Sequence, residues 1–229
     1  MGGSPPGAGV RDGYPGASPP GTAHGGGSLR ARLLAATHAE HARINRHPRL
    51  AGLTRPGYRL AQYRTLLPVY HRFYGLVEGA VLERLKADAV DFSYQERRKL
   101  PWLDQDLAVL GLSPPVLGAG PACRCADLAE AIGAIYPIEG STLGGQLILG
   151  HLRDNLGLTA TTGARFFHGY GADTQRRWAE FLAFAERLVA DPDGQERAAR
   201  MAVQVFRLLR TLLDDETATP GGPGGLVRP

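Results

Sequence analysis

The spacing of the apolar residues is the feature that most constrains the fold of this chain. From about residue 29 to residue 215 they recur at helical intervals, and no segment alternates apolar and polar residues as a half-buried β-strand does. β-Branched residues are sparse, and no internal repeat points to a solenoid. The sequence therefore predicts an all-α protein, a single-domain bundle of about seven helices.

Glycine and proline set the limits of this domain. Nearly half of the 31 glycines and 17 prolines lie within residues 1–28 and 216–229. Segments of this composition bury too little apolar surface to offset the entropy of the chain. We therefore predict disordered tails at 1–27 and 216–229, on either side of a helical domain at 28–215.

Capping residues and prolines predict where the helices begin and end. Ser28 is a suitable N-cap for a first helix that stops at Pro48. Prolines 68, 101 and 137 are expected to kink or interrupt three later helices, because proline cannot donate a backbone hydrogen bond. Asp173 is expected to cap the helix that follows it. These later helices are predicted at about 59–88, 93–111, 127–157, 173–190 and 193–213.

Charge and cysteine content exclude several classes of protein. The 26 basic residues against 22 acidic ones are nearly all arginine, scattered among the acidic residues without an aromatic-basic motif, so no nucleic-acid partner is expected. No apolar run reaches the length of a membrane span, and the N-terminus lacks the pattern of a secretory signal. Cys123 and Cys125 cannot build a disulfide framework; we expect exposed loop cysteines and a cytoplasmic location.

His41 is a titratable imidazole on the predicted apolar stripe of the first helix. At 100° per residue it shares a face with Leu33, Leu34, Thr37 and Ile44. Two interpretations are open. The ring is either a core histidine that bonds to a carbonyl or a tyrosine hydroxyl, or it is a ligand to a metal.

Three glycines, Gly140, Gly144 and Gly145, fall within six residues of a predicted helix. Each glycine there costs about 1 kcal/mol relative to alanine, so a close approach must compensate. Gly140 and Gly144 are four residues apart and form a strip without side chains. Either another helix packs on this strip or a flat ligand lies on it, and a kink at the glycines is compatible with both.

The histidine and the glycine strip together favour one explanation. In an all-α chain with no other catalytic set, they suit a flat metal macrocycle such as heme, held between two helices.

The segments ATHAEH, YPIEGSTLGGQLI and FFHGYG, with a Pro-Gly-Tyr and helix pattern after the first, resemble the heme oxygenases, particularly the bacterial biliverdin-producing members. The resemblance covers about residues 29–215. It implies O2-dependent cleavage of heme to biliverdin, carbon monoxide and free iron, with heme as both substrate and cofactor. It also implies an external electron donor, a reductase or a ferredoxin, and a bilin-dependent photoreceptor as a user of the product.

By this resemblance His41 would be the proximal iron ligand, and Thr37, one turn earlier, also matches the family pattern. Gly140 and Gly144 would be the distal glycines that leave room for oxygen above the heme, with Ser141 as the third residue of the catalytic set.

Two departures from the family pattern matter. Many members carry an aspartate where this chain has Ser141, and a serine can hold a water but cannot carry that charge. Basic residues that meet the heme propionates in animal enzymes are replaced by Phe167 and Gly171, which leaves as candidates Arg30, Arg32, Arg207 and Arg210. A heme carrier or sensor without catalytic activity is therefore the alternative, and a bundle of the same fold with another ligand or none is a third hypothesis.

Overall fold

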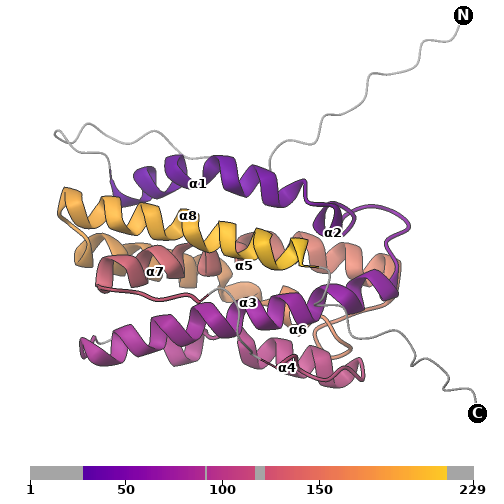
Figure 1. The fold of residues 1–229 in the computed structure, drawn as a ribbon. Helices are drawn as coiled ribbons and strands as arrows, with labels where there is room; N and C mark the ends of the chain where they lie inside the picture. Colours follow the sequence, from indigo (N-terminus) through magenta and orange to yellow (C-terminus); the bar gives the residue numbers. More distant parts are fainter. Residues whose placement is uncertain (1–27, 91, 117–121, 216–229) are drawn as a thin grey trace, which may run out of the picture.

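The computed structural model describes residues 28–90, 92–116 and 122–215. Over these ranges the chain forms eight α-helices, two 3-10 helices and no strand, which confirms the all-α class (Figure 1). The predicted tails at 1–27 and 216–229 lie outside the described residues. The elements are α1 (Leu29–Asn45), α2 (Pro48–Ala51), α3 (Leu60–Ala87), η1 (Tyr94–Arg97), α4 (Leu100–Val109), α5 (Leu128–Leu156), α6 (Arg165–His168), η2 (Gly171–Asp173), α7 (Thr174–Leu188) and α8 (Pro192–Asp214).

Helices α1 and α5 both lie along α8 and run parallel to it (Figure 1). On α5, a Cβ atom added to Gly133 would stand 2.1 Å from the carbonyl oxygen of Ala198, so this contact between backbones requires glycine. On α1, Arg32 pairs with Glu196 near the start of α8, and Glu40 pairs with Arg207 eleven residues further on. Residues near the start of α1 and of α5 contact residues near the start of α8, as expected for parallel helices.

Of the two outcomes expected at Pro68 and Pro137, a kink or an interruption, the structure excludes the interruption. Pro68 lies inside an unbroken α3 and Pro137 inside an unbroken α5, so in each case the chain continues as one helix. Pro101 occupies the first turn of α4, where its missing N–H would lack an intrahelical partner anyway. The helix expected at 93–111 is therefore η1 followed by a separate α4, and Pro101 helps to begin α4 rather than interrupting it.

The expected caps have mixed outcomes. The Ser28 hydroxyl accepts the backbone N–H of Ala31 at 3.2 Å and caps α1 as predicted. Asp173 holds the N-cap position of α7, but its carboxylate does not cap the helix and instead pairs with Arg176 at 3.0 Å. Helices α2 and α6 were not foreseen, because four residues are too short to show a periodic pattern.

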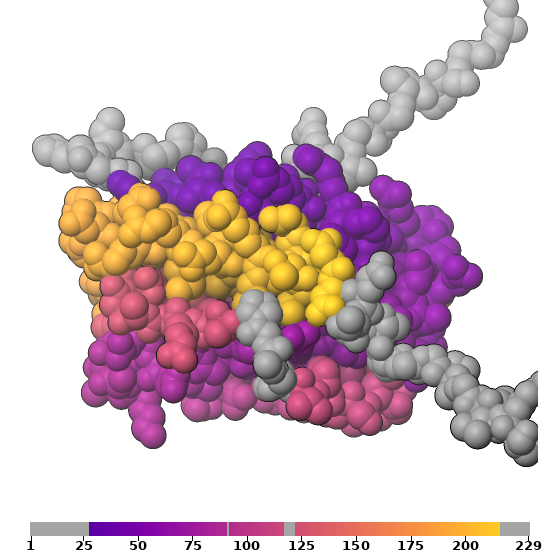
Figure 2. Space-filling model, viewed as in Figure 1, coloured from indigo at the N-terminus to yellow at the C-terminus, as the bar shows by residue number. Residues whose placement is uncertain are grey.

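A continuous core of leucine, isoleucine, valine, alanine and aromatic side chains fills the space between the helices. Figure 2 shows α8 lying along one face of the molecule, with α1 at its upper edge and α3 below. Among the described residues, no helix has the length and hydropathy required to cross a membrane.

Candidate functional site

Two of the residues predicted to bind a ligand, His41 and Gly144, lie toward the same end of α8. Glu40, next to His41, is level with Arg207 of α8, and Gly144 follows the Gly133–Ala198 contact by eleven residues along α5. A helix rises about 1.5 Å per residue. His41 therefore lies about 14 Å beyond the Arg32–Glu196 contact along α1, and Gly144 lies about 16 Å beyond the Gly133–Ala198 contact along α5. The register brings the C-terminal halves of α1 and α5 to the same end of α8.

His41 is half-buried on α1. Its ring makes an edge contact with the ring of Phe206 on α8, with centroids 5.8 Å apart. Its Nδ1 lies 3.4 Å from Nδ2 of Asn45, one turn later on the same helix. An imidazole can ligate a metal through one nitrogen while a hydrogen bond at the other selects its tautomer.

The buried face of α1 differs from the predicted stripe. Leu33, Thr37 and Ile44 are buried as expected, but Leu34 is 44% exposed. Its place is taken by Glu40, which is only 3% exposed. The buried face of α1 is therefore rotated about the helix axis relative to the predicted stripe, and His41 lies at the edge of the observed buried face.

Arginines make the burial of Glu40 possible. Arg43 donates to its Oε1 at 2.7 Å and Arg207 to the same oxygen at 3.2 Å, while Arg210 lies 3.7 Å from Oε2. Burial raises the pKa of Glu40, but these three guanidinium groups outweigh that effect and hold the pKa below its usual value. The sequence shows Glu40 and Arg43 three residues apart, and Arg207 and Arg210 three residues apart, but no local pattern joins the two pairs.

The glycines of α5 have different surroundings. Gly140 is buried, while Gly144 is exposed and a Cβ atom added there would meet nothing within 4 Å. A Cβ atom on Gly145 would stand 2.7 Å from the carbonyl oxygen of Phe167, so this glycine serves close packing against α6. Gly144 thus leaves bare helix backbone beside open space, and Leu147, one turn further, is 63% exposed.

Ser141 is exposed between Gly140 and Gly144, and its hydroxyl is fixed by two contacts. It donates to the carbonyl oxygen of Ile138 at 2.7 Å, and its oxygen lies 2.9 Å from the hydroxyl of Tyr74 on α3. Because the serine proton is used on Ile138, Tyr74 donates in the second contact. Burial raises the pKa of Tyr74, so the phenol keeps its proton at neutral pH.

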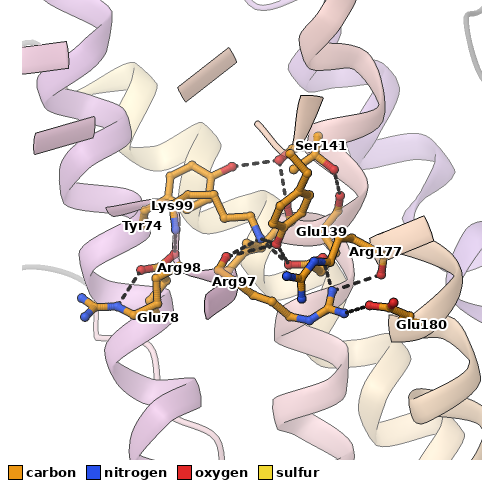
Figure 3. A network of polar contacts seen from close by, with 12 residues as sticks. Tyr74, Glu78, Arg97, Arg98, Lys99, Glu139, Ser141, Arg177 and Glu180 are labelled. Atoms are coloured by element: carbon orange, nitrogen blue, oxygen red, sulfur yellow. Dashed lines mark hydrogen bonds and ion pairs between the residues drawn. The ribbon is translucent and has the colours of Figure 1, made fainter. Parts of the chain in front are cut away.

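A buried ionic cluster lies directly behind this segment (Figure 3). Glu139 and Lys99 are both 0% exposed, and Arg97 is 3% exposed. Lys99 Nζ donates to Glu139 Oε1, and Arg97 Nη1 donates to Glu139 Oε2 at 2.9 Å. No sequence pattern predicted this cluster. Its one signal was a glutamate in an otherwise apolar and glycine-rich segment.

Asp106 holds the short helix α6 against α4. Its two carboxylate oxygens accept the backbone N–H groups of Arg165 at 2.6 Å and Phe166 at 2.9 Å. Burial raises its pKa to about 6, despite these hydrogen bonds. This contact positions Phe167, whose carbonyl faces Gly145.

The remaining candidate residues lie apart from this end or serve packing. Arg30 is exposed at the start of α1, eleven residues before His41, which is about 16 Å along the helix axis. Thr37 is buried and its hydroxyl donates to the carbonyl oxygen of Leu33 at 2.7 Å. Cys123 and Cys125 are free thiols, but they are half-buried against the core, so the expectation of exposed cysteines was wrong.

Comparisons with known proteins agree on one family. The heme oxygenase family model matches residues 120–215. A heme oxygenase from Xanthomonas campestris pv. campestris is 29% identical over 154 residues, which cover 67% of this chain and 90% of the relative. A heme oxygenase structure from Neisseria meningitidis, described in its NO- and CO-bound forms, superposes with a TM-score of 0.70 at 22% identity, over 81% of this chain and 90% of that one. The heme oxygenase structure from Leptospira interrogans gives a TM-score of 0.67 at 18% identity, over 81% and 98%.

Proposed function

Because this chain belongs to the heme oxygenase family, we propose that it binds heme and cleaves it with O2 to biliverdin, carbon monoxide and free iron. The observation that carries the proposal is that a half-buried histidine on α1 and an exposed glycine on α5, Gly144, both lie toward the same end of α8. An external donor, a reductase or a ferredoxin, would supply the electrons.

The residues at this end suit a flat, apolar ring with an iron atom at its centre. His41 would ligate the iron through Nε2, which requires Nδ1 to carry the proton and to donate it to the Asn45 side-chain oxygen after the amide turns. The bare backbone at Gly144 and the exposed Leu147 would cover the other face of the ring. Bound heme supplies the redox chemistry that activates O2.

Orientation would be the main contribution of α5. The bare backbone at Gly144 would let the helix approach the substrate closely, which would exclude water from that face and limit how O2 reaches the ring edge. Ser141 Oγ, held by Tyr74, would keep a water in place near this surface and so support proton delivery.

Arg207 and Arg210 are the better placed of the candidate partners for the heme carboxylates. Both lie on α8 beside Glu40, the residue before His41, whereas Arg32 pairs with Glu196 toward the other end. Their guanidinium groups are partly exposed, so they can bind a further carboxylate while they hold Glu40.

A heme carrier or sensor is the second candidate function. One observation favours it. The position where many family members carry an aspartate is Ser141, whose hydroxyl is already engaged by Tyr74 and Ile138. Such a site binds heme but delivers protons poorly.

One experiment separates these functions. Hemin is added to the purified full chain, the absorption spectrum is recorded, and a reductant is then supplied in air. Loss of the Soret band with growth of a biliverdin band supports the oxygenase, whereas a stable heme spectrum supports the carrier. If no heme spectrum forms at all, both functions are wrong.

A further inference from the structure

We propose that Lys99 and Glu139 form a buried clamp that fixes the position of Gly140 and Ser141 on α5. This inference rests on the proposed function, because it concerns how the face of α5 that would meet heme is held in place.

Glu139 has both carboxylate oxygens engaged from one side (Figure 3). Oε1 accepts from Lys99 Nζ and from the Tyr170 hydroxyl at 2.9 Å, while Oε2 accepts from Arg97 Nη1 at 2.9 Å. These partners come from the segment before α4 and from the turn that precedes α7. The glutamate therefore ties the middle of α5 to two other parts of the chain.

Lys99 is equally well satisfied. Besides Glu139, its ammonium group donates to the carbonyl oxygen of Arg97 at 2.7 Å and to the Tyr170 hydroxyl at 2.8 Å. Three donors thus meet three acceptors in a site with no solvent exposure. Removing one charge of such a pair leaves the other buried and uncompensated, which is strongly destabilising at that place.

Glu78 of α3 holds the other side of the same segment. Its Oε1 accepts the backbone N–H of Lys99 at 2.5 Å, and its Oε2 pairs with Arg98 at 3.3 Å. Tyr74 lies one turn before Glu78 on α3 and donates to Ser141. The contacts therefore close a ring from α3 through Lys99 to Glu139, along α5 to Ser141, and back to α3 through Tyr74.

The clamp matters because α5 is open at Gly144. Gly144 lacks a side chain and faces open space, so no packing at that position opposes a shift of the helix. Glu139, the residue immediately before Gly140, anchors this part of α5 from the buried side. A buried ion pair adds little net stability over apolar residues of similar size, so we assign this pair the role of fixing one geometry.

The test compares Lys99→Met with Lys86→Met in the full chain without heme. Lys86 is the only other lysine and lies exposed at the end of α3, which makes it a matched control. We expect the backbone amides of residues 140–144 to exchange hydrogen about tenfold or more faster in Lys99→Met, with α8 unchanged, because a local contact opens while the remaining bundle stays packed. The control should match the wild-type chain.

If hydrogen exchange in Lys99→Met is faster by the same factor at all protected amides, Lys99 supports the whole fold. If exchange is not faster at residues 140–144, Lys99 does not hold this part of α5. Either result overturns the clamp. The double variant Lys99→Met with Glu139→Leu covers the case in which the single variant does not fold, since it removes both charges together. In the double variant, exchange at residues 140–144 should stay fast while the thermal midpoint recovers, and wild-type exchange there also overturns the clamp.

A second measurement connects the clamp to heme. In the reduced, carbon monoxide complex, Lys99→Met should shift the C–O stretching frequency, which reports on groups near the bound gas, and Lys86→Met should not. An unchanged frequency together with fast exchange would contradict the functional part of the inference. A chain that binds no heme fails the proposed function, whereas the exchange result is independent of heme.

Discussion

The hydroxyl oxygens of Tyr74 on α3 and Ser141 on α5 lie 2.9 Å apart, and Tyr74 donates because the Ser141 proton is engaged by the Ile138 carbonyl oxygen. Tyr74→Phe keeps the ring and removes this bond, at a stability cost of about 1 kcal/mol. We expect heme binding to persist and the rate of Soret loss under reductant to fall several-fold. Tyr58→Phe is the control, because the buried Tyr58 hydroxyl has no hydrogen-bond partner among the described residues. Equal rates in both variants would contradict a role for the Tyr74–Ser141 contact.

Ser141→Asp places a carboxylate beside the Tyr74 hydroxyl, at the position where many heme oxygenases carry one. A positioned acid that can supply a proton accelerates turnover, so the rate of biliverdin formation should rise by about tenfold or more. Rates are compared under saturating hemin and a fixed reductant concentration. An unchanged rate would mean that proton delivery does not limit this protein.

His41→Ala should abolish or strongly alter the heme spectrum, and added imidazole should restore it by taking the place of the side chain. Asn45→Ala removes the neighbour of Nδ1, and loss of such an outer partner typically weakens binding by about tenfold. Hemin titrations followed at the Soret band measure both effects. A wild-type spectrum in His41→Ala would assign the axial role to another residue.

The two neighbouring glycines of α5 should respond in opposite ways. Gly144→Ala meets no atom within 4 Å and removes a helix-interior glycine, so thermal unfolding should show a gain of up to about 1 kcal/mol. Gly145→Ala brings Cβ to 2.7 Å from the Phe167 carbonyl oxygen and should lose about 1–3 kcal/mol.

A larger side chain at Gly144 should affect heme binding rather than folding. Gly144→Leu should fold, yet lower heme affinity or turnover, because its side chain fills the open surface. Normal binding and turnover in Gly144→Leu would show that heme does not lie on this glycine.

Asp106 predicts a pH dependence of stability. Its pKa is raised from 3.8 to about 6 in the folded protein, so the folded state binds the extra proton between these values. The stabilisation that the folded state gains from this proton on Asp106 is therefore fully present below about pH 4 and is lost as the pH rises to about 6. Asp106→Asn does not titrate, so its stability relative to wild type should rise over this interval, as urea unfolding at several pH values would measure. Parallel stability curves for the two proteins would contradict the raised pKa.

Local sequence signals determined the helical class and most helix positions. The Ser28 cap, the helical periodicity and the glycines after residue 139 act over one or two turns, so they can be read without knowing what packs against them. The same local pattern located His41 on α1 and Ser141 on α5. The resemblance that linked them to heme was therefore available from the chain alone.

Only the tertiary structure decided which faces and partners these helices use. The helical periodicity predicted Leu34 rather than Glu40 on the buried face of α1. Glu40 is buried because arginines of α8, more than 160 residues away in sequence, bind its carboxylate. The different roles of Gly144 and Gly145 depend on where α6 lies, and the pairing of Glu139 with Lys99 depends on the path of the chain between α3 and α4. Such contacts follow from the register between helices, which no local pattern encodes, since it is set when the whole core packs.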